Sequence, residues 1–380
     1  MSKRIMVLGG GMVGGFIARE LARDGRFEVT LADRDGDALD RSAKRQAMRV
    51  VAADLAQPSV VRDLAAGADL VVGAVPGFLG YKAVEAALDA GRNVVDISFF
   101  PEDPFGLDAL AKERGLVAVV DCGVMPGLGG MLGLHMARRL ERAERLLIQV
   151  GGLPVERRWP TEYKAPFSPI DVIEEYVRPA RFRQDGRIVT KPALSDAELV
   201  DLPGVGTLES FNTDGLRTLL TTMSLPDMRE KTLRWPGHID KMRMLRDLGF
   251  FRDEPVATRS GAVRPIDLTA QLLFKEWKLE QGTQELTVMR VEVEGERGGA
   301  RTTLCCDLLD RTDPVTGDSS MARTTGWPAV IAAQLFFEGS LAWKGVVPAE
   351  RFAESDAVFS AMRDRLGGFG VGLRFSESRA

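Results

Sequence analysis

Hydrophobic and polar positions in the first third of the chain alternate in a pattern that predicts strands separated by helices. Short apolar runs predict the strands, and the longer amphipathic segments between them predict the helices. The predicted strands cover 4–8, 27–32, 47–52, 69–74, 93–97 and 116–120, and the predicted helices cover 12–23, 58–66, 81–90 and 107–114. Strands that alternate with helices of this length need parallel crossovers, so we expect a doubly wound α/β sheet.

The pattern changes after Gly127, where turn signals become frequent. Asp185-Gly186 and the segment 296–299 predict hairpin turns, and 286–293 and 302–309 are predicted to form an antiparallel pair. Helical patterns accompany these strands at 170–176, 241–248 and 266–275. We therefore expect a second, α+β domain appended to the first.

The remaining chain is predicted to contain one more helix, at 327–342, that returns to the first domain, and a polar, frayed tail after Phe375. The expected domains are 1–124, a Rossmann dinucleotide-binding domain, 125–326, the α+β domain, and 327–380, the C-terminal helix and tail. A length of 380 residues is consistent with more than one domain.

Composition excludes several classes of protein. Hydrophobic residues make up 45% and charged residues 27%, with a net charge of −4, so nothing indicates a nucleic-acid or membrane partner. No apolar run is long enough to span a bilayer, and residues 1–4 lead directly into a strand rather than a signal peptide. Three cysteines and two histidines show no metal-ligand spacing, so we expect a reduced, cytoplasmic protein without a metal.

The strongest motif is Gly9-x-Gly11-x-x-Gly14, which follows the first predicted strand and opens a helix. In this context the first glycine allows a tight turn, the second allows the backbone to approach a pyrophosphate, and the third allows close helix packing. The pyrophosphate then meets the helix N-terminus, where Met12 and Val13 add backbone N–H groups. These five residues are predicted to bind a dinucleotide.

Asp33 ends the second predicted strand, where a carboxylate can bind the ribose hydroxyls. This favours NAD, because a carboxylate repels the 2′-phosphate of NADP. The adjacent Arg34 leaves NADP open, since a guanidinium can pair with that phosphate or stack on adenine. Asp54, after the third strand, fits either a contact to the adenine edge or a solvated loop residue.

Three further segments follow predicted strands, at the edge of the sheet where α/β proteins bind ligands. Small residues and prolines there are expected to form a rigid floor for the ribose and nicotinamide. The residues assigned to cofactor contact are Ala74, Val75, Pro76, Asp96, Ser98, Cys122, Gly123 and Val124. Asp96 equally fits a cap for backbone N–H groups, and Cys122 fits a packing residue better than a nucleophile, because no histidine is placed to activate it.

These motifs together resemble the saccharopine dehydrogenase family. The matching segments are the glycine-rich turn, Asp33, Asp96-x-Ser98, Asp121-x-Gly123-Val124-x-Pro126-Gly127, and the runs 150–154, 209–213 and 233–238. Within that family the chain is most similar to the lysine 6-dehydrogenases. The resemblance implies NAD(P)-linked oxidation of an amino-acid amine, or the reverse reduction of an imine, by a homodimer.

The resemblance also implies positions for the substrate-side residues. Ser98 and Phe99 would line the nicotinamide and substrate side, Thr213 would face the substrate, and the run from Trp235 through Gly237 to His238 would close the pocket. Two departures are visible. Met125 stands where saccharopine reductases carry an acidic residue, and the run 214–218, which includes Asp214 and Thr218, matches neither relative.

Amine oxidation also needs a proton acceptor and a carboxylate partner. A histidine has a suitable pKa, and His238 lies in a loop, whereas His135 lies in a predicted packed helix. His238 fits a base, a substrate ligand or a structural turn residue. Arg217 is the first choice for a substrate carboxylate, although a solvated arginine is the alternative, and Tyr163 lies in a loop that can reach the pocket. The predicted catalytic residues are His238, Arg217, Thr213 and Tyr163.

Two other functions stay open at this point. The same fold can reduce another imine or a carbonyl substrate, and a dinucleotide-binding sensor without catalysis can share it. The polar residues predicted around the second-domain pocket favour an enzyme, because a sensor has no need of them.

Overall fold

The structure is a computed structural model that describes residues 2–165, 169–280 and 282–379. The chain forms two compact units. The first contains Met1–His135 and Met321–Gly372, and the second contains Met136–Ser320 and Leu373–Ala380. The sequence pattern predicts domain boundaries after residues 124 and 326. The chain leaves the first unit near the end of helix α6 (Leu128–Ala137), which carries no glycine or proline break at that point.

The first unit is built on a seven-stranded parallel sheet with the strand order β17-β6-β5-β4-β1-β2-β3. Its strands are β1 (Lys3–Leu8), β2 (Phe27–Asp33), β3 (Arg49–Ala52), β4 (Leu70–Gly73), β5 (Asn93–Asp96), β6 (Val117–Val120) and β17 (Gly345–Pro348). The order reverses between β1 and β4, and ligands of such sheets bind at this switch point, outside the carboxyl ends of the strands.

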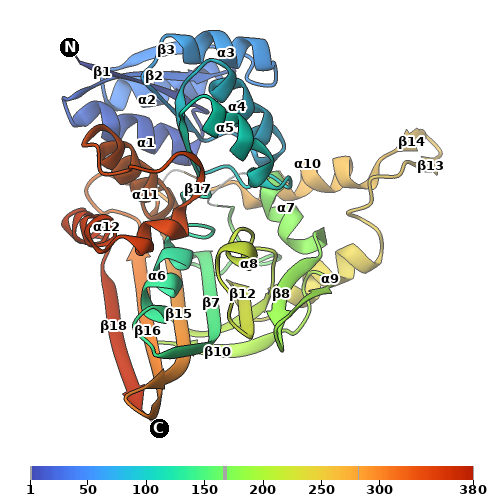
Figure 1. Ribbon diagram of the computed structural model, residues 1–380. Helices are drawn as coiled ribbons and strands as arrows, with labels where there is room; N and C mark the ends of the chain where they lie inside the picture. The colour runs from blue at the N-terminus through green and yellow to red at the C-terminus, as the bar shows by residue number, and fades with distance from the viewer. Residues whose placement is uncertain (1, 166–168, 281, 380) are drawn as a thin grey trace. The chain divides into compact units, whose positions relative to one another are not determined.

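Helices cover both faces of this sheet (Figure 1). They are α1 (Met12–Arg23), α2 (Gly36–Arg45), α3 (Pro58–Ala66), α4 (Gly77–Asp89), α5 (Asp108–Glu113), α11 (Ser320–Phe337) and α12 (Asp356–Gly368), with short 3-10 turns at Pro104–Leu107 and Ala349–Glu354. Buried residues of α3, α4 and α5 pack against one face. On the opposite side α1 meets α11, where the rings of Phe16 and Trp327 lie 5.2 Å apart.

The predicted α/β fold class is confirmed, and all six predicted strands of this sheet are present within a few residues. Helices α2 and α12 and the seventh strand, β17, were not predicted from the sequence. The residues Gly345–Pro348 are short and apolar, and they become a strand because β6 offers them a parallel edge, with Val346 opposite Ala118. A four-residue run more than 200 residues from its neighbour carries little periodic signal of its own.

The second unit is built on a nine-stranded mixed sheet. Its strands are β7 (Arg142–Pro154), β8 (Ala180–Gln184), β9 (Arg187–Lys191), β10 (Glu198–Leu202), β11 (Gly206–Asn212), β12 (Asp227–Arg234), β15 (Glu285–Arg297), β16 (Ala300–Arg311) and β18 (Leu373–Arg379). The main path runs β10-β11-β12-β7-β15-β16-β18; β8 pairs with β12, and β9 pairs with β8. Only β12 and β7 run parallel along this path.

Helices α7 (Pro169–Val177), α8 (Leu219–Thr222), α9 (His238–Asp247) and α10 (Pro265–Trp277) accompany this sheet, and β13 (Val256–Thr258) and β14 (Gly261–Val263) form a separate hairpin. The predicted antiparallel pair of β15 and β16 and the turn at Asp185-Gly186 are confirmed. The expectation of a frayed tail is wrong: residues 373–379 form β18, which pairs with β16 from Leu308↔Leu373 to Thr302↔Arg379.

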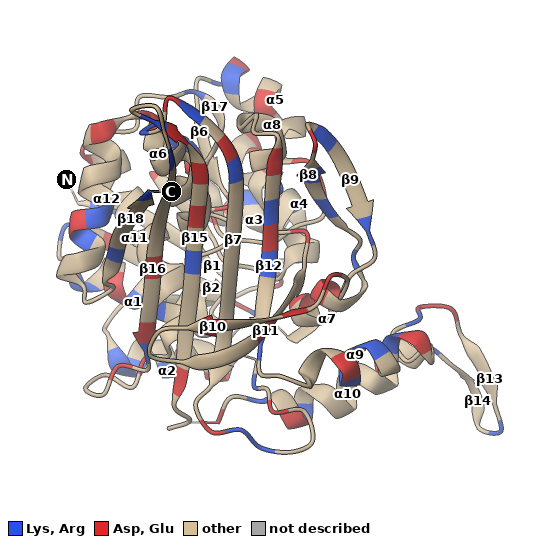
Figure 2. Cartoon of the chain, turned by 90° about the horizontal axis from the view of Figure 1, so that it is seen from below, with Lys and Arg blue, Asp and Glu red and all other residues tan. Residues whose placement is uncertain are grey.

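The two faces of this sheet differ in polarity. On one face lie buried apolar residues, among them Ile148 and Val150 of β7 and Val291 of β15. The other face carries Arg229 and Lys231 of β12 and Arg290 of β15, and Figure 2 colours the charged positions along these strands. Arg290 and Asp307 form an ion pair on this face, with Nε and Oδ1 2.7 Å apart. The period-two alternation of a strand with one buried face explains this pattern.

No helix in the described part of the chain is long and apolar enough to cross a membrane.

Candidate functional site: a dinucleotide cradle and a buried polar cluster

The glycine-rich turn of the first unit is shaped by close backbone contacts. Gly9 has φ +104°, and a Cβ there would lie 2.3 Å from the carbonyl oxygen of Ala74. A Cβ on Gly14 would lie 2.0 Å from the carbonyl oxygen of Gly9. Both positions therefore require glycine to let β1, α1 and the end of β4 meet. A Cβ on Gly11 would meet nothing within 4 Å, so the space above it is open.

Helix α1 presents an uncapped N-terminus at this turn. Its N-cap is Gly11, which offers no side-chain acceptor, and its first turn has no acidic residue. Met12 is 41% exposed and Val13 is half-buried, so the N-terminal turn faces solvent. Free backbone N–H groups and the helix dipole favour an anion here. A glycine cradle with open space at a helix N-terminus fits the pyrophosphate of a dinucleotide.

The Asp33 carboxylate is bound to the glycine-rich turn as well as to its own loop. It accepts hydrogen bonds from the N–H groups of Gly10, at 2.5 Å, and Asp35, at 2.8 Å. Asp33 is half-buried, whereas Arg34 beside it is exposed. The residue therefore fixes the turn in addition to any contact with a ribose.

Asp54 is exposed and accepts hydrogen bonds from its own loop, from the side chain of Gln57 at 3.0 Å and from the N–H of Ala56 at 3.1 Å. These bonds, with the Gln57 side chain first, lower the pKa of Asp54 below its usual value. The loop bonds fit the solvated-loop interpretation of Asp54.

The other predicted cofactor residues lie at the carboxyl ends of β4, β5 and β6. Val75 is buried between half-buried Ala74 and Pro76, and Pro76 is the N-cap of α4. Asp96 is fully buried and accepts from the N–H of Ser98 at 2.8 Å and from its hydroxyl at 3.1 Å. Asp96 thus orients Ser98, which is the role of a cap.

The loop after β6 is compact. The Met125–Pro126 peptide bond is cis, and the N–H of Gly123 donates to the carbonyl of Pro126 at 3.1 Å. Val124 is buried, while Met125 and Phe99 are half-buried. Cys122 is fully buried, and burial raises the pKa of its thiol above the usual range. A buried neutral thiol fits packing rather than nucleophilic chemistry.

In the second unit, a buried guanidinium organises the end of β12. Arg234 is 2% exposed and forms an ion pair with Glu175 of α7. Its Nε donates to the hydroxyl of Tyr176 at 3.3 Å, and its guanidinium lies over the ring of Tyr163, 4.5 Å from the centroid. A charge buried in this way needs such partners, because desolvation is otherwise unfavourable. Arg234 is thus engaged within the protein.

His238 belongs to the same cluster and has a defined tautomer. Its Nδ1 lies 2.8 Å from the carbonyl oxygen of Thr161, which can only accept, so Nδ1 carries the hydrogen. Its Nε2 therefore accepts from the hydroxyl of Tyr176, at 2.9 Å. Burial, followed by the charge of Arg234, lowers the pKa of His238 to about 3.

This arrangement bears on the predicted role of His238 as a base. Both ring nitrogens are bonded inside the protein and the ring is 1% exposed, so the geometry fits a positioning residue better than a proton acceptor. Tyr163 packs beside it, with ring centroids 5.3 Å apart, and its buried hydroxyl has no hydrogen-bond partner in the described ranges. The structure brings these two predicted residues together.

Thr213 begins a buried loop that contains the other predicted substrate residues. Its hydroxyl donates to Glu230 of β12 at 2.6 Å and lies 2.8 Å from the hydroxyl of Thr232. Asp214 is bound by Arg181, with the carboxylate 2.7 Å from Nη2, so this aspartate is already paired. Arg217 and Thr218 are both buried, and Arg217 has φ +44°. The interpretation of Arg217 as a solvated surface arginine is therefore wrong.

Trp235 and Gly237 shape the turn between β12 and α9. The indole N–H of Trp235 donates to the carbonyl of Pro154 at 2.9 Å, and the N–H of Gly237 donates to Glu209 at 3.0 Å. Gly237 has φ +90°, which favours glycine. Both residues are half-buried and engaged in the turn itself.

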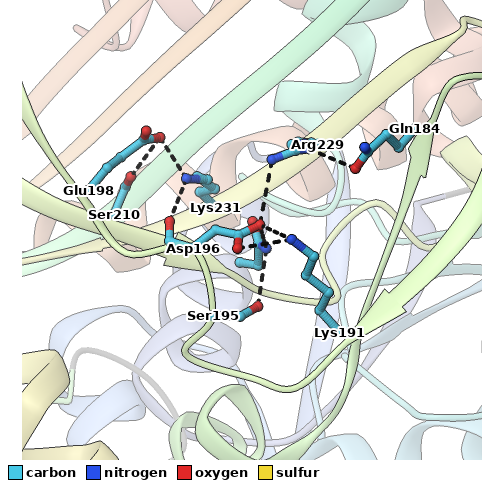
Figure 3. Close-up of polar contacts among 9 residues, drawn as sticks. Gln184, Lys191, Ser195, Asp196, Glu198, Ser210, Arg229 and Lys231 are labelled. Carbon is cyan, nitrogen blue, oxygen red and sulfur yellow. Dashed lines mark hydrogen bonds and ion pairs between the residues drawn. The ribbon is translucent and has the colours of Figure 1, made fainter.

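The opposite face of β12 carries a separate polar network, drawn in Figure 3. Lys231 is 3% exposed and donates to Glu198 at 2.6 Å and to the carbonyl of Asp196 at 2.8 Å. Asp196 also accepts from Lys191 at 2.7 Å and from Asn212 at 3.0 Å. This network ties β9, β10, β11 and β12 together, so it stabilises the strand that carries Glu230 and Arg234.

Sequence reasoning missed Glu230, Arg234, Glu175 and Tyr176. The sequence feature that could have identified Glu230 and Arg234 is the run Asp227-Met-Arg-Glu-Lys-Thr-Leu-Arg234, which has polar residues on both faces of one strand. A central strand with charges on both faces is unusual, because one face is normally apolar. Among the described residues no group of three or more His, Cys, Asp or Glu side chains could hold a metal ion.

Comparisons with known proteins agree with this arrangement. A family model described as the saccharopine dehydrogenase C-terminal domain matches residues 123–371, and one described as the saccharopine dehydrogenase NADP binding domain matches residues 5–119. The saccharopine dehydrogenase [NADP(+), L-glutamate-forming] of Saccharomyces cerevisiae is 22% identical over 440 residues, which cover 97% of this chain and 98% of that protein.

Two other kinds of relative are similar to the chain. The mitochondrial alpha-aminoadipic semialdehyde synthase of Mus musculus is 24% identical over 419 residues, covering 91% of this chain and 45% of that protein. The chain thus spans about half the length of this relative. A carboxynorspermidine synthase of Vibrio cholerae is 25% identical over 391 residues, covering 91% of this chain and 92% of that protein.

Among solved structures, the apo saccharopine dehydrogenase (L-Glu forming) from Saccharomyces cerevisiae has the same fold, with a TM-score of 0.80 at 18% identity over 99% of this chain and all of that one. The prediction that NAD is preferred over NADP finds no support in these comparisons, because the matched N-terminal model and the yeast relative are both described by NADP.

Proposed function

Because the chain belongs to the saccharopine dehydrogenase family, we propose that it is an NADP-linked oxidoreductase that acts on the carbon–nitrogen bond of an amino-acid substrate. The observation that carries this proposal is the open glycine cradle at the N-terminus of α1, where Gly9 and Gly14 admit no side chain and Gly11 leaves space. The names of the yeast and mouse relatives support an amino-acid substrate.

The second unit supports a polar substrate. Among the buried side-chain groups that have no hydrogen-bond partner within the described chain are the hydroxyl of Tyr163, the indole N–H of Trp277 and the hydroxyl of Thr287. Tyr163 and Trp277 pack edge to face with centroids 5.4 Å apart, and Thr287 lies opposite Gly152 of β7. Leaving such groups unpaired costs about 1–3 kcal/mol each, so a polar ligand or water is expected to bind them.

The residues of the first unit have defined parts in this function. When bound, the nicotinamide ring supplies the hydride acceptor or donor for the reaction. The N–H groups at the start of α1 would bind the pyrophosphate, Asp33 would hold the adenosine side of the turn, and Ser98, oriented by Asp96, would present its hydroxyl at the end of β5. The buried core beneath them excludes water from this floor.

The choice of NADP is tested through Arg34, which is exposed beside Asp33 and free to pair with a 2′-phosphate. Arg34→Ala is expected to raise the KM for NADPH about tenfold and to leave the KM for NADH unchanged, because only NADPH carries the phosphate. Arg62→Ala, an exposed arginine on α3, is the control. An equal effect on both cofactors would contradict the assignment.

The reaction is tested by NADPH- and NADP-linked absorbance with saccharopine, L-lysine and other amino-acid amines. Turnover on one of them fixes substrate and cofactor together. The similarity to a carboxynorspermidine synthase over nearly the full chain favours a second candidate, a carboxylated polyamine substrate, so carboxynorspermidine belongs in the same panel. NADPH binding without any turnover would favour a non-catalytic sensor or another imine or carbonyl substrate.

Three finer points stay predictions within this proposal. They are the closer similarity to lysine 6-dehydrogenases, the homodimer and the cytoplasmic location. Light scattering of the purified protein measures the oligomeric state, and the substrate panel decides between lysine and saccharopine.

A further inference from the structure

We propose that Glu230 is the residue of the second unit that binds a positively charged nitrogen of the substrate. The inference rests on the proposed function in that it takes the substrate to be an amino acid or another amine. It concerns a side chain that none of the motifs in the sequence singled out.

The position of Glu230 is exceptional for a carboxyl group. It is 3% exposed and stands on the apolar face of the sheet, directly opposite Ile148 of β7, which in turn lies opposite Val291 of β15. Burying a carboxylate among apolar residues is strongly unfavourable unless it is paired. A carboxyl group at this position therefore needs a compensating charge or hydrogen bond, from the protein or from a ligand.

The protein satisfies only one of the two carboxyl oxygens. Oε2 accepts from the hydroxyl of Thr213 at 2.6 Å and from the N–H of Gly215 at 3.1 Å. Oε1 has no hydrogen-bond partner in the described ranges of the chain. The carboxyl also lies against the backbone of Gly215, where an added Cβ would be 2.6 Å from Glu230 Cδ. The group is therefore held in one orientation with one oxygen left over.

Within the described ranges of the chain, the Glu230 carboxyl forms no ion pair with a cation. The charged groups that act on it are Glu175 of α7 and Asp214 of the adjoining loop, and both are acidic. Two arginine ion pairs lie close by, and in them Arg234 pairs with Glu175 and Arg181 with Asp214. Burial, followed by the charge of Glu175, raises the pKa of Glu230 to about 8, against the hydrogen bonds from Thr213 and Gly215 that lower it.

A purely structural role would not require an acid. A glutamine at this position could accept the same two hydrogen bonds without any charge to desolvate. The feature that glutamine lacks is the ability to ionise, and an ammonium group supplies the missing opposite charge at Oε1. Binding then releases the carboxyl proton to solvent, and a charge-assisted hydrogen bond forms between the substrate N–H and Glu230.

The test measures proton release on binding. Calorimetric titration at pH 7 in two buffers of different ionisation enthalpy gives the number of protons released per ligand. We use saccharopine and L-lysine as probes and adipate as the amine-free control. The native chain is expected to release close to one proton with the amines and none with adipate, because Glu230 is mainly protonated at pH 7 before binding.

Two variants localise the effect. Glu230→Gln keeps the contacts to Thr213 and Gly215 and is expected to abolish proton release and to weaken amine binding about 10- to 100-fold. It leaves NADPH binding unchanged. Glu254→Gln makes the same chemical change at an exposed carboxylate elsewhere in the second unit and is expected to change neither quantity.

The outcomes separate this inference from the proposed function. Turnover with an amino-acid amine, but with no proton release and no weaker binding in Glu230→Gln, would leave the function and overturn the inference. Amine binding with proton release but without NADP-linked turnover would support the role of Glu230 and contradict the proposed oxidoreductase function. Failure of every amine to bind the native chain would overturn the inference, because an ammonium site must hold at least the probes that carry one.

Discussion

Adding a methyl group is expected to have different effects at two glycines of the glycine-rich turn. Comparing the two variants therefore distinguishes an effect on stability from an effect on cofactor binding. A Cβ on Gly14 would collide with the carbonyl of Gly9, whereas one on Gly11 would project into open space where a pyrophosphate must approach. Gly14→Ala is therefore expected to lower both the melting temperature and NADPH affinity, and Gly11→Ala to lower affinity at least tenfold with little change in melting temperature.

Thermal unfolding and fluorescence titration with NADPH measure the two effects. Gly36→Ala, where an added Cβ meets nothing within 4 Å, is the control. If Gly11→Ala bound NADPH as tightly as the native chain, the assignment of this turn to the pyrophosphate would fail.

The buried state of His238 makes the stability of the protein depend on pH. Its pKa is about 3 in the folded chain and about 6.5 when unfolded, so the unfolded chain takes up a proton as the pH falls below 6.5 while the folded chain does not. The stability is therefore complete above pH 6.5 and is lost on acidification. His238 alone is expected to lower the free energy of unfolding by about 1 kcal/mol between pH 7 and 5.5.

Urea unfolding at both pH values, compared with His238→Asn, measures this contribution. The variant is expected to be less stable at pH 7, because Tyr176 and Thr161 lose their partner, and to lose less stability on acidification. An equal loss in both proteins would show that His238 is not buried and neutral.

At the level of elements, helix α11 packs against α1 through a glycine. A Cβ on Gly326 would lie 2.5 Å from Cδ1 of Phe16, so the two helices approach closely at this point. Gly326→Val is expected to lower the free energy of unfolding by about 1–3 kcal/mol through overpacking. Gly367→Ala in α12, where a Cβ meets nothing, is expected to be neutral or slightly stabilising. Urea denaturation of both variants measures these changes in the free energy of unfolding.

Helix α1, which has a strong local pattern, was predicted, and strand β18, which depends on a distant neighbour, was not. Helix α1 was predicted with its observed ends because its glycines and apolar face are adjacent in the sequence. Strand β18 was not, because its residues are mostly polar and exposed and form a strand only where the edge of β16 accepts them.

For the whole molecule, the first unit is discontinuous in sequence, because residues 321–372 of the chain complete it. Strand β17 supplies the buried Val346 and Val347, and the fully buried Phe352 follows it. A chain that ends at Ser320 is expected to lose NADPH binding, since β6 and Phe16 lose their cover. A chain that ends at Gly372 lacks only β18 and is expected to keep NADPH affinity within about twofold.

Fluorescence titration with NADPH and circular dichroism of the two truncated chains test this dependence. Binding by the chain that ends at Ser320 would contradict the discontinuous first unit. Loss of binding in the chain that ends at Gly372 would show that the second unit's edge strand supports the dinucleotide cradle.

The sequence by itself determined the dinucleotide cradle and the class of fold. These depend on short-range rules, the period of apolar residues and the space that glycine leaves in a turn, which act between neighbours in the chain. The tertiary structure alone decided the burial and the pairing of Glu230, Arg234 and His238, because both depend on side chains that lie far apart in the sequence. The sequence pattern of a polar residue in a strand is the same whether its side chain faces water or the buried face of a sheet. Only the packed fold shows which of these two environments the side chain has.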